Sequence, residues 1–123
     1  MPNWEPNWED VQWDQGAARD AMRALRDAAD MLDQTAAERA RVAQEATEQW
    51  RGRYRDEFDD HLQQILRRAH DLAGEYRDMA NRIARADQGA FEEQRRRERE
   101  RERWRMEKEA EERALRRQQL EGS

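Results

Sequence analysis

Length, composition and charge favour a small protein of long exposed helices. The chain has 123 residues, of which 43% are charged and 36% are hydrophobic, and its net charge is −5. This composition is typical of long helices and coiled coils. Acids and bases are too evenly balanced to create the strongly positive surface that non-specific binding of nucleic acid needs. The absence of cysteine excludes disulfides and thiolate metal sites.

Residues 1–13 are predicted to form an irregular arm. They contain the tetrapeptide Pro-Asn-Trp-Glu twice, at 2–5 and 6–9. The prolines oppose a helix, and each residue before a proline is biased towards extended geometry. We expect the tryptophans of this docking arm to fold back over the helices that follow, the alternative being contact with another protein. These tryptophans are Trp4, Trp8 and Trp13.

A first helix is predicted from about residue 14 to 49, because apolar residues recur there at helical spacing. Asp14 is the expected N-cap. The apolar stripe contains Leu25 and Leu32 but is otherwise rich in alanine, so a neighbouring helix can approach closely. A second helix is predicted from about 53 to 87, and its stripe carries bulkier side chains. The predicted interface residues of this second helix are Tyr54, Phe58, Leu62 and Leu66.

The junction between these helices reads Trp50-Arg51-Gly52. Glycine tolerates the left-handed or tight backbone that a helix reversal needs, and the tryptophan supplies a large apolar face beside it. Residues 14–90 are therefore predicted to form an all-α helical hairpin. A lone hairpin leaves much of its apolar stripes exposed, so we expect a second copy or a partner chain to cover them.

Residues 91–123 form an Arg/Glu-rich tail, predicted to be helical or partly disordered. Opposite charges recur four residues apart, as in Glu92–Arg96, Glu93–Arg97 and Arg103–Glu107, and each such pair stabilises a helix by about 0.2–0.5 kcal/mol. We interpret the tail as a solvated helix or a frayed end in preference to a docked partner helix.

Residues that could perform catalysis or hold a metal are sparse. Serine occurs once, at Ser123, so nucleophilic catalysis has no candidate. His61 and His70 are nine residues apart, which turns them about 180° from each other on one helix. We therefore expect neither an enzyme, nor a cofactor, nor a metal site.

The Trp50-x-Gly52 motif between two long helices, with Phe58 eight residues after the tryptophan, resembles the WXG superfamily of type VII secretion substrates. These small helical hairpins are related to the early secreted antigen pair of mycobacteria. The resemblance covers roughly residues 14–90, with Trp50 and Gly52 matching the turn motif. It implies dimerisation into an antiparallel four-helix bundle. Family members often carry an acid four residues after a tyrosine as an export signal, whereas Tyr76 is followed by Ala80 here.

The resulting hypothesis is a substrate, adaptor or carrier of a type VII secretion system that acts through protein association. Its implied partners are a second copy or a related helical hairpin, and a secretion ATPase or a larger effector. The alternative is a cytoplasmic coiled-coil scaffold without an export role. The chain lacks a signal-peptide pattern and any stretch of about 20 apolar residues. We thus expect a cytoplasmic location or export without a cleavable leader, with no membrane insertion and no nucleic-acid partner.

Overall fold

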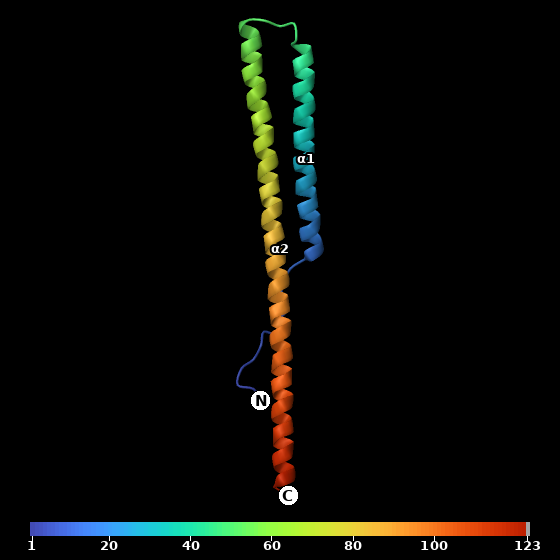
Figure 1. Cartoon of the computed structure of the whole chain (residues 1–123), viewed down its shortest axis with the longest axis vertical. Coiled ribbons are helices and arrows are strands. Elements are labelled where there is room, and N and C mark those ends of the chain that lie inside the picture. Colours follow the sequence, from blue (N-terminus) through green and yellow to red (C-terminus); the bar gives the residue numbers. More distant parts are fainter. Residues whose placement is uncertain (123) are drawn as a thin grey trace. The chain divides into compact units, whose positions relative to one another are not determined.

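The computed structural model describes residues 1–122, which form two long helices (Figure 1). Helix α1 spans Gln15–Ala46, 32 residues, and helix α2 spans Arg53–Glu121, 69 residues. No strand occurs within residues 1–122, and the predicted all-α class is confirmed for them. The chain divides into two compact units. One is Asp14–Arg85, called the hairpin below, and the other joins residues 1–13, the arm, to α2 from Ala86 onward.

In the hairpin, α1 and the first part of α2 pack against each other. The Asp14 side chain accepts a hydrogen bond of 2.9 Å from the Ala17 amide, and this confirms the predicted N-cap. Two alanines of each helix are buried at the contact, which allows the helices to approach closely. These are Ala18 and Ala29 of α1 and Ala73 and Ala80 of α2. The larger apolar side chains are less well covered.

An ion-pair group also joins the two helices of the hairpin. The guanidinium of Arg77 on α2 donates to Asp30 at 2.9 Å and to Asp33 at 2.6 Å, both on α1. These bonds, that to Asp33 being the stronger, raise the pKa of Arg77 above its ordinary value. Because all three side chains are more than a third exposed, the group orients the helices more than it stabilises them.

The connection between the helices begins at Thr47, somewhat earlier than the predicted helix end near residue 49. The Thr47 hydroxyl donates a hydrogen bond of 2.7 Å to the Ala43 carbonyl. The Thr47 amide donates a second one, of 3.0 Å, to the same carbonyl. Thr47 is buried, and its own carbonyl accepts from the Arg55 guanidinium of α2. A small polar residue that caps the last turn of α1 therefore ends the helix before Trp50 is reached.

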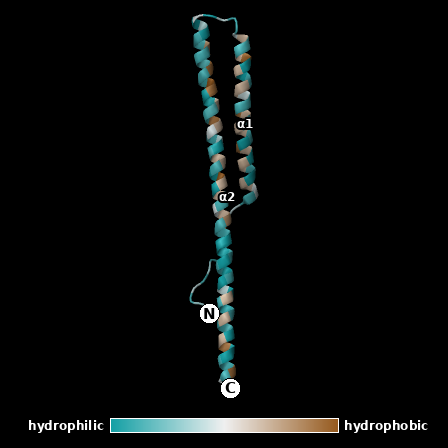
Figure 2. Cartoon of the chain, in the orientation of Figure 1, coloured by the Kyte–Doolittle hydropathy of each residue, from teal (hydrophilic) through white to brown (hydrophobic). Residues whose placement is uncertain are grey.

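In the second unit, α2 continues past residue 87, where the second helix was predicted to end, and stays helical to Glu121. The arm runs beside this part of α2 without regular secondary structure (Figure 1). Most residues of this part of α2 are hydrophilic (Figure 2). Within residues 1–122, no helix is long and apolar enough to cross a membrane.

Candidate interaction surfaces

The connection between the two helices, at the end of the hairpin, contains Trp50 and Gly52, which are separated by Arg51. Gly52 has φ +91°, a left-handed conformation that L side chains rarely adopt. The Trp50 ring makes an edge contact with Phe58, with ring centroids 5.7 Å apart. Trp50 nevertheless remains 48% exposed and Tyr54 80% exposed. The glycine is therefore required by the backbone, whereas the two aromatic rings present surface to solvent.

The predicted interface residues of the hairpin are only partly covered by α1–α2 packing. Those with intermediate burial are Leu25, Leu32, Phe58, Leu62 and Leu66. A second set on α2 is more open, at 44%, 37% and 47% exposure. This set, called the exposed stripe below, consists of Ile65, Leu72 and Met79.

The exposed stripe has the geometry of a helix-packing surface. Its members are seven residues apart, so they lie along one line of α2. At helical spacing, Ile65, Leu72 and Met79 belong to the same apolar stripe of the sequence as Leu62 and Leu66. In the structure the stripe divides into two parts. Leu62 and Leu66 are better covered than Ile65, Leu72 and Met79.

The arm lies along α2 without regular secondary structure, with bends at Asn3 and Glu9, and runs in the opposite direction. Trp13 donates its indole N–H to Asp87 at 2.8 Å, and Trp4 donates to Glu107 at 2.6 Å. These two acceptors are twenty residues apart on α2, about 30 Å at about 1.5 Å per helical residue. The expectation that the arm folds over the hairpin is thus replaced by docking on the C-terminal part of α2.

Side chains of α2 satisfy the main chain of the arm. A segment without regular secondary structure leaves most of its amides and carbonyls unpaired, so these groups need partners from elsewhere. Arg101 donates to the carbonyl of Asn7 at 2.9 Å and to that of Glu9 at 2.7 Å. Arg97 donates to the same Glu9 carbonyl at 3.0 Å, and Gln94 accepts from the Val11 amide at 2.8 Å. The α2 residues that contact the arm, called the arm-binding face below, are Asp87, Gln94, Arg97, Arg101, Arg103, Trp104, Arg105, Glu107 and Glu111.

Aromatic contacts anchor the two Pro-Asn-Trp-Glu repeats. The Trp8 ring meets Trp104 edge to face at 5.3 Å, and Trp104 is 9% exposed, the best covered large side chain of this unit. The Trp4 ring stacks under the Arg103 guanidinium at 4.3 Å. The Trp104 indole N–H has no hydrogen-bond acceptor within residues 1–122. The Trp104 ring is therefore covered by Trp8 and by the Lys108 ammonium, 5.3 Å from the ring centroid, without a hydrogen bond from its N–H.

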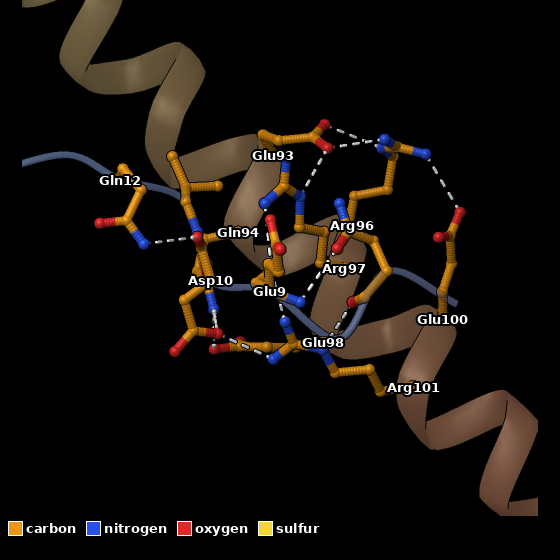
Figure 3. Close-up of polar contacts among 12 residues, drawn as sticks. Glu9, Asp10, Gln12, Glu93, Gln94, Arg96, Arg97, Glu98, Glu100 and Arg101 are labelled. Atoms are coloured by element: carbon orange, nitrogen blue, oxygen red, sulfur yellow. Dashed lines mark hydrogen bonds and ion pairs between the residues drawn. The ribbon is translucent and has the colours of Figure 1, made fainter. Parts of the chain in front are cut away.

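Charges on the arm-binding face are fixed by further hydrogen bonds (Figure 3). Asp10 accepts from Gln94 and from Arg101, both at 2.9 Å, and these two bonds, that of Gln94 first, lower the pKa of Asp10. Glu93 accepts from Arg96 at 2.7 Å and from Arg97 at 3.0 Å, which lowers its pKa to about 2. Glu93 thus holds Arg97 in place for the Glu9 carbonyl.

The arm-binding face was missed by reasoning from the sequence. The signal that could have found it is Trp104, a large aromatic residue in a charged helix. Two predicted charge pairs of the tail are confirmed, Glu93–Arg97 at 3.0 Å and Arg103–Glu107 at 3.8 Å. The better covered residues of this part of α2 also recur at intervals of three and four. Apart from Glu93 and Glu100, which are also half-buried, they are Asp87, Ala90, Gln94, Arg97, Arg101, Trp104, Lys108 and Glu111. This recurrence marks one face of the helix as covered, even though most of its side chains are polar.

The side chains within residues 1–122 form no cluster of histidine, cysteine or carboxylate groups suited to a metal ion. Comparison with known proteins yields no match: no protein family, no curated protein and no solved structure is recognisably similar to the chain. The surfaces described above therefore carry the functional argument.

Proposed function

We propose that this chain is a WXG-like helical hairpin that acts by association, as a substrate, adaptor or carrier of a type VII secretion system. One observation carries the proposal: the connection between two packed helices contains Trp50, partly exposed, and Gly52, in a left-handed conformation. The φ of +91° at this position favours glycine, because other residues rarely adopt such a conformation. The neighbouring aromatic surface of Trp50 and Tyr54 is open to a partner.

The exposed stripe supports association with a second copy or a related hairpin. Full burial of a leucine, isoleucine or methionine side chain contributes about 1.5–3 kcal/mol. Because Ile65, Leu72 and Met79 retain 37–47% exposure, covering the remainder contributes about 1 kcal/mol for each side chain. A partner helix laid along all three would form the antiparallel four-helix bundle of this proposal.

The first test is the mass of the chain in solution. Sedimentation equilibrium at micromolar concentrations should give a dimer for the wild-type chain. Leu72→Asp with Met79→Asp should give a monomer, because each change buries an unpaired charge in the interface. Gln63→Asp with His70→Asp is the matched control: it adds two aspartates seven residues apart at exposed positions outside the exposed stripe, and it should leave the dimer intact. A wild-type monomer would refute self-association.

The second test concerns export. Deletion of the type VII secretion ATPase in the native host should shift this protein, or its partner hairpin, from the medium or cell surface into the cell. An unchanged distribution, with the protein retained inside the cell in both strains, would exclude the secretion role and support the scaffold alternative. Trp50→Ala should reduce export while leaving the dimer intact if the exposed ring is a recognition element.

A further inference from the structure

The docked arm is held in a way that does not depend on which chain supplies it. Arg97 and Arg101 bind carbonyl oxygens of the arm main chain, and Gln94 binds a main-chain amide. The geometry points to an exchange of arms between copies: the arm-binding face of one chain accepts residues 1–13 of a second copy. This interaction surface is separate from the exposed stripe and requires no pairing of hairpins.

The chemistry of the face fits this occupant. Its three side chains that bind main-chain groups match an irregular segment such as the arm, whereas a helix would have already paired its own amides and carbonyls. The arm also brings complementary charge, because Asp10 lies 2.9 Å from Arg101 and accepts from Gln94 at 2.9 Å. Two tryptophans, four residues apart, fill separate places on α2. A second copy carries the same residues in the same order.

The position of the arm in the chain allows it to leave as a whole. Trp13 is the last arm residue of one compact unit, and Asp14 is the first residue of the other. Asp14 has extended backbone angles, φ −90° and ψ 97°, and its capping bond to Ala17 does not involve the arm. A change of torsion at this joint would move the arm without disturbing α1. Exchange of such an element is a low-cost route to a dimer.

An empty face has a physical reason to recruit another arm. Trp104 is 9% exposed with the Trp8 ring against it, and the Arg101 side chain is 13% exposed with the arm bound. Removing the arm returns a large aromatic ring to water, which is unfavourable. The chain's own arm competes at a high effective concentration, so exchange is best seen where that arm cannot bind.

Two complementary variants create this situation. The arm variant, Trp4→Ala with Trp8→Ala, keeps an intact face. The face variant, Arg97→Ala with Arg101→Ala, keeps an intact arm, and alanine preserves the helix. In each full-length variant, the arm cannot dock stably on α2 of its own chain or on α2 of an identical chain. Mixed in equal amounts, they should form a 1:1 complex, identified by its mass in native mass spectrometry, that is absent from either variant alone.

Hairpin pairing is removed from this measurement by placing Leu72→Asp and Met79→Asp in both variants. If hairpins do not pair, the wild-type chain sediments as a monomer. That result does not affect the measurement of arm exchange. Arg95→Ala with Arg99→Ala is the matched control for the face, since it removes two arginines four residues apart that make no contact with the arm among the interactions described. The control chain should close normally and give no complex with the arm variant.

A labelled synthetic peptide of residues 1–13 provides a second measurement that needs no change in α2. Fluorescence anisotropy should show at least about tenfold tighter binding to the arm variant than to the wild-type chain, whose own arm competes. A 1:1 complex together with peptide binding supports exchange. Peptide binding without the complex would overturn exchange between copies, and absence of both would overturn the face as a binding site.

Discussion

Replacement of Arg101 by alanine tests the assignment of the arm-binding face most directly. This side chain makes three of the contacts to the arm, to the carbonyls of Asn7 and Glu9 and to the carboxylate of Asp10. Alanine removes all three without altering the helical backbone. We therefore expect Arg101→Ala to shift the arm towards an undocked state while α2 stays helical.

The size of the shift follows from the two carbonyl bonds. Hydrogen bonds that involve a charged group contribute about 1.5–3 kcal/mol when buried. Asn7 and Glu9 are exposed residues, so we take about 1 kcal/mol for each bond and about 2 kcal/mol in total. The undocked population should then rise about 30-fold. The ion pair to the exposed Asp10 is screened by solvent and is left out of this figure.

Amide hydrogen exchange at Val11 measures this population, because its N–H donates 2.8 Å to the Gln94 side chain only while the arm is docked. The Val11 protection factor should fall about 30-fold in Arg101→Ala. It should fall less in Arg101→Lys, because the ammonium can still donate to one arm carbonyl, although it cannot reproduce the guanidinium fork. Arg99→Ala is the control and should leave Val11 unchanged. Equal protection of Val11 in Arg101→Ala and Arg99→Ala would refute the arm-binding face.

Three further outcomes are expected. The pKa of Asp10 is lowered below 3.8 in the docked state, so its contribution to docking is complete above about pH 4 and is lost as the pH falls through the lowered value. An NMR titration should show a higher Asp10 pKa in Arg101→Ala. Gly52→Ala should lower stability by about 1–2 kcal/mol because of its φ of +91°, whereas Gly74→Ala, a mid-helix site with no atom within 4 Å of the added carbon, should raise it by up to about 1 kcal/mol. Chemical denaturation measures both, and the reverse order would contradict the assigned backbone. Trp50→Ala should cost about 1 kcal/mol in the same assay, since the ring is 48% exposed and contacts Phe58 by an edge. A loss of about 3–5 kcal/mol would mean that the ring is fully buried in solution.

Helical periodicity was sufficient to predict α1 and the part of α2 as far as about residue 87, and residue type was sufficient to predict the cap at Asp14. Both signals are local, since they depend on spacing along one helix or on one side chain beside its own backbone. The early end of α1 was less predictable. Thr47 is buried through a hydrogen bond to Ala43 and a contact from Arg55 eight residues later, and neither partner is evident from the sequence around it.

The docking of the arm could not be predicted from patterns of apolar residues. Half of its hydrogen bonds to α2 use main-chain carbonyls and amides of the arm, and such groups are present throughout any sequence. On α2, Arg97 and Arg101 have the same spacing as arginines in solvated ion pairs, so charge patterning alone favoured an exposed helix. Trp104 was the informative exception, because a large aromatic residue in a charged helix needs cover.

The spacing of two arm tryptophans has a consequence for how the arm and α2 can change together. Trp4 and Trp8 are four residues apart, and their rings lie against Arg103 and Trp104, which are neighbours on α2. A substitution at an exposed residue such as Glu5 leaves both rings in place. A one-residue deletion between Trp4 and Trp8 would draw one indole away from Arg103 or Trp104. Diverging sequences should therefore keep the length of the arm more strictly than its composition.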